Sequence, residues 1–245
     1  MTDRTTLVCL PFAGAGASFY RPWQRLAEPY GFDVLPLQLP GRERLIDQEP
    51  YRDASTAADG LLADLLAALG DSPEPRRIAL FGHSLGAVLA YELARRLVGT
   101  PGVTLVRLFA SGSPHPAEQR ARRATGLDDD AFLERVNEFA GYTHEALQDP
   151  EMRELILPTL RADVEMHESY VPDAEQVLPV PVTSLRGTAD TLVSREEAAA
   201  WARTTTGGYH EAELAGGHMY LTDSAPELIR TVAVDLALSA EELCV

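Results

Sequence analysis

Short apolar segments alternate with longer amphipathic ones along most of this chain of 245 residues. Short apolar runs bounded by turn residues are typical of buried strands, and apolar positions three or four apart are typical of helices. The expected strands are Thr6–Leu10, Asp33–Leu37, Arg77–Phe81, Thr104–Ala110, Val182–Arg186 and Tyr209–Leu214. The expected helices are Ser55–Leu69, Ala87–Val98, and two that start with capping boxes at Ser194 and Ser224 and end near Thr204 and Ser239. This alternation predicts an α/β fold, with a mostly parallel central sheet and helices on both faces.

One stretch interrupts the alternation, because no strand pattern appears between His115 and Pro179. Apolar residues recur there at helical spacing in two stripes, namely Phe132, Leu133, Val136 and Phe139, and then Met152, Leu155, Ile156, Leu160 and Val164. Stripes of this kind also serve ordinary core packing. We expect residues 116–178 to form a helical lid, inserted into a single domain that spans residues 1–245.

The most specific chemical signal is Gly82-His83-Ser84-Leu85-Gly86, which lies between a predicted strand and a predicted helix. A G-x-S-x-G sequence in that setting is typical of the nucleophile elbow of α/β-hydrolases, in which a sharp turn lifts the serine hydroxyl above the sheet. The flanking glycines let the backbone turn without Cβ clashes. The sequence therefore predicts an α/β-hydrolase fold with Ser84 as the nucleophile.

A catalytic serine needs a base, and the base needs an acid to orient it. In this fold the order along the chain is Ser, then Asp or Glu, then His. His218 fits as the base, because it lies in a glycine-rich loop after the last predicted strand, and Asp190 fits as the acid, because it follows the preceding strand. The alternatives are a loop histidine bonded to backbone and an aspartate that only forms a turn. The other five histidines lie in the elbow, before or within the helical stretch, or beside the last strand.

Backbone N–H groups are expected to form the oxyanion hole. One belongs to Leu85, the residue after the nucleophile, and the other comes from the loop after an early strand. That loop is Pro11–Gly16, in which we choose Ala13, with Phe12 as the alternative. Glycine-rich loops after strands also bind phosphates, but neither phosphate-binding glycine motif is present here.

Four segments together resemble the type II thioesterases, which are stand-alone α/β-hydrolases that accompany polyketide synthases and nonribosomal peptide synthetases. The segments are Leu10–Ser18, Leu39–Glu43, the elbow, and Gly217-His218. The elbow is shared with many lipases and esterases, whereas its combination with Leu39–Glu43 is far more specific. The resemblance covers essentially the whole chain. It implies hydrolysis of stalled or wrong acyl groups from the phosphopantetheine arms of acyl or peptidyl carrier proteins, which the enzyme would meet in trans. Ala15 departs from the further glycine that many relatives carry.

Composition excludes several other classes of function. The net charge of −16 argues against nucleic acid and anionic membranes as partners. The chain has no lysine, which excludes Schiff-base catalysis, a pyridoxal-phosphate lysine and a phosphate-loop lysine. It shows neither an apolar run of membrane-spanning length nor a signal peptide, and Cys9 and Cys244 are too few for a disulfide framework or a zinc site. We expect a cytoplasmic monomer that uses no cofactor and no metal.

Substrate contacts are harder to assign from sequence. Arg42 and Arg44 follow a predicted strand, at the sheet edge where ligands bind, and Arg120, Arg122 and Arg123 form a second cluster. Either group is a candidate for contacting a phosphate or the carrier protein, and solvated surface arginine is the alternative. The candidates for lining the acyl pocket are adaptable aromatic and methionine side chains, which could equally belong to the core: Phe12, Phe132, Phe139, Met152 and Met166.

Three rival functions remain open at this point. An oxygen-ester hydrolase would use the same three residues, and the sequence separates it from a thioesterase only through family resemblance. An acyltransferase would need a pocket that excludes water and admits an acceptor. A non-catalytic, hydrolase-like binding protein usually has an incomplete triad, whereas all three residues are present here.

Overall fold

The computed structural model describes residues 4–118, 123–140, 149–172 and 177–242. Within these residues, six strands form one sheet in the order β2-β1-β3-β4-β5-β6, and every neighbouring pair is parallel. The strands are β1 Thr6–Leu10, β2 Asp33–Pro36, β3 Arg76–His83, β4 Val103–Ser111, β5 Val182–Gly187 and β6 Tyr209–Leu214. Each predicted strand is confirmed to within two residues at either end. Parallel pairing brings the carboxyl ends of all six strands to the same edge of the sheet.

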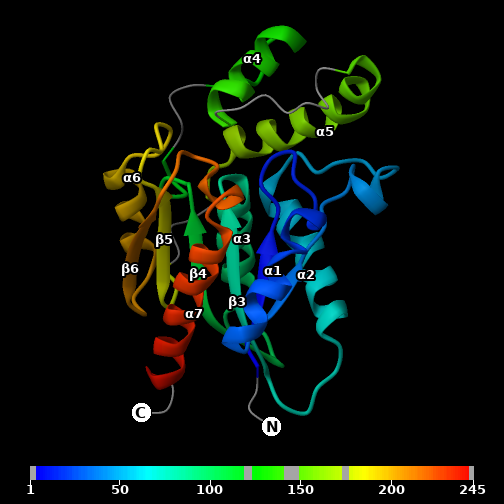
Figure 1. The fold of residues 1–245 in the computed structure, drawn as a ribbon. Coiled ribbons are helices and arrows are strands. Elements are labelled where there is room, and N and C mark those ends of the chain that lie inside the picture. The colour runs from blue at the N-terminus through cyan, green and yellow to red at the C-terminus, as the bar shows by residue number, and fades with distance from the viewer. Residues whose placement is uncertain (1–3, 119–122, 141–148, 173–176, 243–245) are drawn as a thin grey trace.

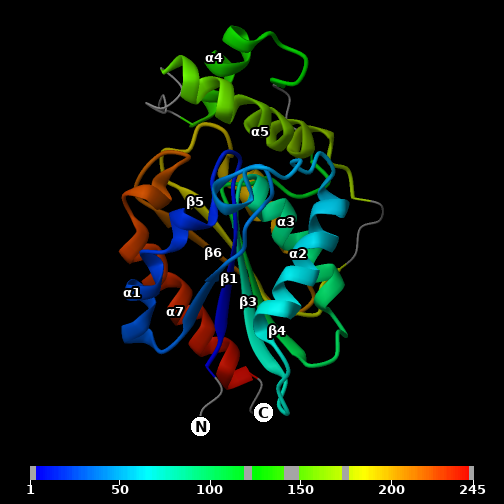
Figure 2. The same ribbon diagram turned by 90° about the vertical axis from the view of Figure 1, so that its right-hand side faces the viewer.

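Helices cover both faces of this sheet (Figures 1 and 2). Helices α2 and α3 pack on one face, and α1 and α7 pack on the other. The helices are α1 Trp23–Ala27, α2 Ala54–Leu69, α3 Leu85–Leu97, α4 Asp129–Ala140, α5 Pro150–Ser169, α6 Arg195–Ala199 and α7 Ala225–Glu242. Short 3₁₀ turns lie at Ala17–Tyr20, Glu28–Tyr30, Glu43–Leu45, Ala200–Thr204 and Tyr220–Thr222. The predicted fold class is confirmed.

Alternation along the central strands divides the core into two layers. In β1, Val8 and Leu10 point into the layer under α2 and α3, whereas Leu7 and Cys9 point into the layer under α1 and α7. All four side chains are fully buried. A strand that is apolar on both faces is typical of a parallel sheet covered by helices on both sides. This burial makes the central strands a rigid base for the loops at their carboxyl ends.

Helices α4 and α5 lie across the carboxyl edge of the sheet, at the top of Figure 1. They pack on each other through a small separate cluster whose buried members include Phe132 and Leu133 of α4 and Leu157 and Leu160 of α5. Ala13, in the loop after β1, packs against the same cluster. The helical pair expected between β4 and β5 is therefore present, and it lies over the end of the sheet that holds the candidate catalytic residues.

The two predicted capping boxes have different outcomes. At Ser194 the box is complete, because its hydroxyl accepts from the Glu197 N–H and the Glu197 carboxylate accepts from the Ser194 N–H. At Ser224 the hydroxyl instead donates to the carbonyl of Ala215 over 3.0 Å. Helix α7 still begins directly after Ser224, whose own carbonyl accepts from the Leu228 N–H.

Candidate active site

Ser84 lies in a strained turn between β3 and α3, with φ 54° and ψ −116°. A residue other than glycine rarely adopts a positive φ, and such strain is common at functional sites. A Cβ on Gly82 would lie 1.9 Å from the carbonyl oxygen of Gly86, and a Cβ on Gly86 would lie 2.6 Å from that of Leu10. Both glycines are therefore required by the close backbone contacts of this turn. The geometry is that of a nucleophile elbow.

His218 and Asp190 form a buried pair beside the elbow. The distance between His218 Nδ1 and Asp190 Oδ2 is 2.9 Å. The other carboxylate oxygen, Oδ1, accepts from the N–H groups of Leu192 and Val193 over 2.8 and 3.1 Å. Burial alone would raise the pKa of Asp190, but these bonds and that from His218 outweigh it and hold the pKa below its ordinary value. The carboxylate is thus ionised at neutral pH.

The loops that carry this pair are bonded to each other. The N–H of Ala189 donates to the carbonyl of Gly216 over 2.8 Å. A Cβ on Gly187, at the end of β5, would lie only 2.1 Å from the carbonyl oxygen of Gly217. Because the β5–β6 register sets the positions of both loops, it also sets the distance between the acid and the base.

His83, the second residue of the elbow, packs behind His218. The two ring centroids are 4.8 Å apart. His83 Nδ1 is 2.8 Å from the hydroxyl of Ser111, which is in turn 2.6 Å from the hydroxyl of Tyr220. Burial raises the pKa of Tyr220, so its phenol stays protonated and can donate. A Cβ on Gly112 would lie 2.4 Å from the His83 ring and 3.2 Å from the His218 ring. Sequence reasoning missed this support, because only the fold brings its members together.

Ser84 and His218 line one pocket of about 80 Å³, together with Phe12 and Ala13. This pocket adjoins a cavity of about 550 Å³, and both are lined by Phe12, Ala13, Val136, Leu160 and Met219. The lining of the larger cavity is mostly apolar, and its volume lies in the range of small-molecule sites. An acyl chain attached at Ser84 would therefore have an apolar space beside it, between the loop after β1 and the two upper helices.

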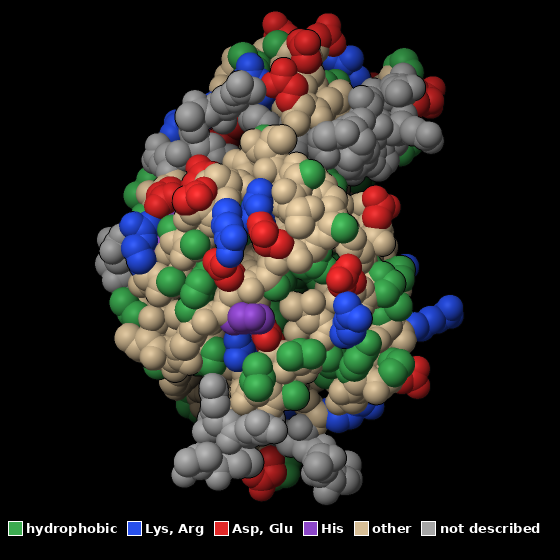
Figure 3. All heavy atoms as spheres, turned by 60° about the vertical axis from the view of Figure 1, so that its left-hand side comes forward, with side chains coloured by type: hydrophobic (Ala, Val, Ile, Leu, Met, Phe, Trp, Pro, Cys, Tyr) green, Lys and Arg blue, Asp and Glu red, His purple; other side chains and the backbone are tan. Residues whose placement is uncertain are grey.

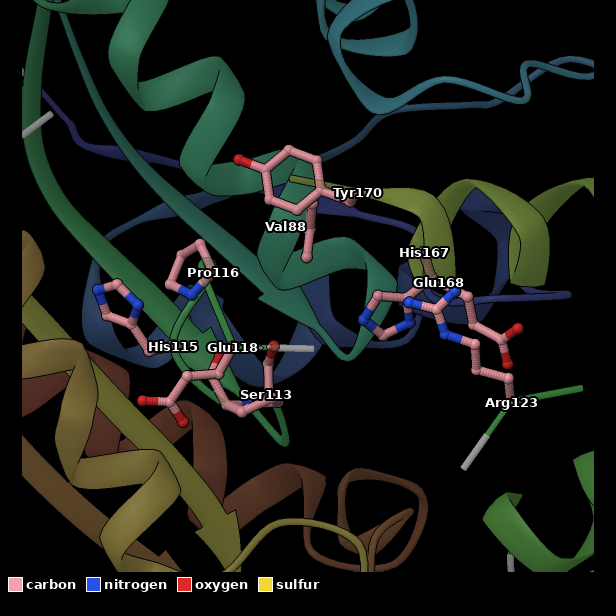
Figure 4. Close-up of a pocket in the computed structure, with 10 residues that line it drawn as sticks. Val88, Ser113, His115, Pro116, Glu118, Arg123, His167, Glu168 and Tyr170 are labelled. Atoms are coloured by element: carbon pink, nitrogen blue, oxygen red, sulfur yellow. Dashed lines mark hydrogen bonds between the residues drawn. The ribbon is translucent and has the colours of Figure 1, made fainter. Parts of the chain in front are cut away.

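His167 and Glu168, at the end of α5, form the boundary between the Ser84 pocket and a second, smaller one. Figure 4 shows His167, Glu168 and Arg123 on one side of this second pocket and Ser113, His115 and Glu118 on the other. Its volume is about 20 Å³, which leaves no room for an acyl chain. The 550 Å³ cavity is thus the better candidate for the acyl group.

The residues predicted to contact substrate are scattered. Phe12 and Arg42 line the large cavity, and Arg44 is exposed at the surface. Phe132 and Met166 are each 1% exposed within apolar clusters, and Met152 is 40% exposed. The side chain of Phe139 lies outside the described part of the structure, as do Arg120 and Arg122.

The cavity is lined instead by other members of the two stripes, namely Val136, Leu155, Ile156 and Leu160. The two apolar stripes were the signal in the sequence for the residues that line this cavity. Periodicity locates the apolar side of a helix but not which of its members face a cavity and which face the core.

Comparison with known proteins identifies the family. The model of the thioesterase domain family matches residues 5–236. Thioesterase PikA5 of Streptomyces venezuelae is 34% identical, over 95% of this chain and 81% of its own length. The gramicidin S biosynthesis protein GrsT of Aneurinibacillus migulanus is 31% identical, over 95% of this chain and 89% of its own.

Among solved structures, the type II thioesterase BorB from the borrelidin biosynthetic cluster superposes with a TM-score of 0.79 and 32% identity. That match covers 97% of this chain and 93% of BorB. This chain belongs to the type II thioesterase family. The resemblance inferred from the four sequence segments is confirmed, and the thioesterase is an enzyme, a hydrolase.

Two negative findings apply to the described part of the thioesterase. No helix there is both long enough and apolar enough to cross a membrane. Nor do its described His, Cys, Asp and Glu side chains form any group of three or more that could hold a metal ion.

Proposed function

We propose that this thioesterase is an editing enzyme that hydrolyses acyl thioesters on the phosphopantetheine arms of carrier proteins, through an acyl-serine at Ser84. One observation carries the proposal. Ser84 and His218, which is bonded to Asp190, line a pocket that adjoins a 550 Å³ cavity, in a chain whose relatives include type II thioesterases. Polyketide and peptide assembly lines hold their intermediates as thioesters, so they supply the matching substrate class.

In the acylation step, Ser84 Oγ attacks the thioester carbonyl carbon and His218 Nε2 takes the serine proton. The bond to Asp190 fixes the proton of the neutral imidazole on Nδ1, which leaves Nε2 as the acceptor. Asp190 also stabilises the imidazolium as it forms. The imidazolium then returns the proton to the departing sulfur, and the carrier arm leaves as a free thiol.

Two backbone N–H groups would receive the negative charge that develops on the carbonyl oxygen. Leu85 is the first residue of α3, and the first N–H groups of a helix have no acceptor within it. Ala13 lies in the loop after β1 and lines the Ser84 pocket. These groups fit the predicted oxyanion hole.

Water completes the cycle. His218 removes a proton from a water molecule, which attacks the acyl-serine carbonyl. The imidazolium returns this proton to Ser84 Oγ as the tetrahedral intermediate collapses, which releases a free carboxylic acid and restores Ser84 and neutral His218. The earlier acylation step needs little acid help from His218, because the departing thiol, with a pKa of about 8.5, is a good leaving group.

Arginines near the site would offset the repulsion between this acidic chain and an acidic carrier protein. On the face shown in Figure 3, arginine and acidic side chains are intermingled. Some arginines of the chain are paired with carboxylates, for example Arg186 with Glu213 and Arg195 with Glu211.

The substrate class is tested by comparing kcat/KM for an acyl-loaded carrier protein with kcat/KM for the p-nitrophenyl ester of the same acyl group. We expect the carrier thioester to be preferred, because binding of the carrier and its arm helps to position the carbonyl at Ser84. A strong preference for the oxygen ester would instead indicate a general carboxylesterase.

We further propose that α4 and α5 act as the predicted lid over Ser84. Helix α5 is bonded to the body, since the Tyr170 hydroxyl after its last turn donates to Glu92 of α3 over 2.6 Å. Among the described residues, the ion pairs between α4 and α5, Arg161 with Asp129 and Arg153 with Asp130, are solvent-exposed and contribute little. Helix α4 is therefore expected to be the more mobile of the two.

Hydrogen exchange tests this lid. Amides of α4 should exchange faster than those of β3, and they should slow when a fluorophosphonate is attached to the active-site serine, because its chain would pack under the helix. If the amides of α4 were as protected from exchange as those of β3, with and without the inhibitor, α4 would be a rigid part of the core and not a lid.

A further inference from the structure

The segment Leu39–Glu43 helped to identify the family, but it takes no part in the chemistry proposed above. Its Arg42 side chain is buried against Asp163 of α5. The two guanidinium nitrogens donate to the two carboxylate oxygens over 2.6 and 2.7 Å. The Asp163 side chain is fully buried, and that of Arg42 is 9% exposed. A buried ion pair contributes little net stability compared with an apolar pair, so its presence points to another role.

Arg42 Nε donates to the carbonyl of Pro40 over 3.4 Å, and two further bonds of the pair go to the backbone of the Phe12–Gly16 loop. Asp163 Oδ2 accepts from the N–H of Gly14 over 2.8 Å. Arg42 donates to the carbonyl of Ala15 over 3.0 Å. The loop that holds the proposed oxyanion donor is thus attached to α5 through one carboxylate.

The shape of the loop depends on the bond at Gly14. The N–H of Ala15 donates to the carbonyl of Phe12 over 2.9 Å, which closes a four-residue turn. Gly14, the third residue, has φ +77°, whereas the φ of Ala13 is not positive. These values describe a type II turn. Type I and type II turns differ by a flip of the central peptide, here the one between Ala13 and Gly14. The bond to Asp163 holds that peptide in its type II orientation.

Helix α5 has a second bond to the same region. The hydroxyl of Thr159, one turn before Asp163, donates to the carbonyl of Gly41 over 2.8 Å. A Cβ on Gly14 would lie 3.2 Å from Leu160, so the helix lies directly on the turn. The position of α5 and the conformation of the turn are therefore linked by contact as well as by charge.

We propose that Asp163, oriented by Arg42, is a positioning residue for the oxyanion hole. It holds the Ala13–Gly14 peptide so that the adjacent Ala13 N–H faces the carbonyl oxygen at Ser84, and the hole is complete only while α5 lies in place. This inference rests on the proposed function, because it takes Ala13 as an oxyanion donor.

The first test is Asp163→Asn, with Glu165→Gln as its matched control. Glu165 is also on α5, but its carboxylate is half-exposed and pairs with the exposed Arg52. For an acyl thioester, Asp163→Asn should lower kcat about 10- to 100-fold with little change in KM, since a misplaced donor costs transition-state binding. The affinity for a trifluoromethyl ketone, which forms an oxyanion on the serine, should fall by the same factor as kcat/KM. Glu165→Gln should behave as wild type.

A second variant separates positioning from stability. Arg42→Met combined with Asp163→Leu removes both charges, and apolar replacement of a buried ion pair is often tolerated. The thermal midpoint of this double variant should therefore lie near the wild-type value. Its kcat should stay low, because the Gly14 N–H still lacks its acceptor. Recovery of kcat along with stability would overturn the proposal. So would an unchanged kcat in Asp163→Asn.

Wild-type protein provides a measurement that does not depend on the folding of any variant. The Gly14 amide should be protected from hydrogen exchange although it lies in a loop, and rapid exchange would contradict the bond to Asp163. Failure of the proposed function has a different signature, because Ser84→Ala would then retain activity. Loss of activity in Ser84→Ala together with normal kcat in Asp163→Asn would reject this inference alone.

Discussion

Ser84→Ala is expected to lower kcat for an acyl thioester by about 10⁴- to 10⁶-fold, because the variant cannot form the acyl-enzyme. The fold should be unchanged, since alanine keeps the Cβ and requires no new contact at the elbow. The rate is measured by release of free thiol, and the fold is checked by the thermal midpoint. Some residual hydrolysis is expected from the oxyanion hole and substrate binding alone. Near-normal turnover with the same midpoint would remove Ser84 from the mechanism.

The second large effect is expected for Asp190→Asn, which should lower kcat about 10⁴-fold. The asparagine oxygen can still accept from the N–H groups of Leu192 and Val193, so the loop should keep its shape. Its amide nitrogen would then face His218 Nδ1 and donate to it. That bond favours the tautomer with the proton on Nε2, which cannot take the proton of Ser84.

The chain contains a matched control for this variant. Asp235, on α7, is fully buried, and its carboxylate lies 3.0 Å from His210 Nδ1, so it forms a second Asp–His pair. It also accepts from the hydroxyl of Thr183 over 2.6 Å, within the body of the protein. Asp235→Asn should lower the thermal midpoint but leave kcat unchanged. Equal losses of kcat in the two variants would mean that Asp190→Asn acts through stability rather than through the tautomer of His218.

The sequence predicted the sheet well, because the two signals of a strand, an apolar run and the turn residues that bound it, are both local. Each strand of this parallel sheet is a short apolar run between turn residues, as Thr6–Leu10 shows with identical predicted and observed bounds. The elbow also depends on neighbouring residues, since Gly82 and Gly86 allow the tight turn around Ser84. The order of Ser84, Asp190 and His218 follows from the fold class. Their roles remain predictions until the variants are measured.

Contacts between distant segments were not predictable in the same way. Arg42 does lie at the carboxyl edge of the sheet, as expected, but its guanidinium bonds Asp163, which is 121 residues away in sequence. The helical spacing of α5 places Asp163 beside its apolar stripe, three residues after Leu160, but periodicity does not show which distant residue Asp163 would contact. Ser111 and Tyr220 likewise reach His83 only because β3, β4 and the loop after β6 converge. The cavity also depends on distant segments, because it forms only when α4 and α5 lie over the carboxyl edge of the sheet.

The central claim is that the acyl group of a carrier thioester passes through Ser84. It is tested most directly by mixing the wild-type enzyme with an acyl-loaded carrier protein, quenching with acid within the first turnovers, and locating the adduct by peptide mass spectrometry. The account predicts a mass increase of one acyl group on the peptide that contains Ser84, together with an equal amount of carrier in its free-thiol form. Release of the carrier thiol with no acyl group on Ser84, or with the group on another residue, would contradict it.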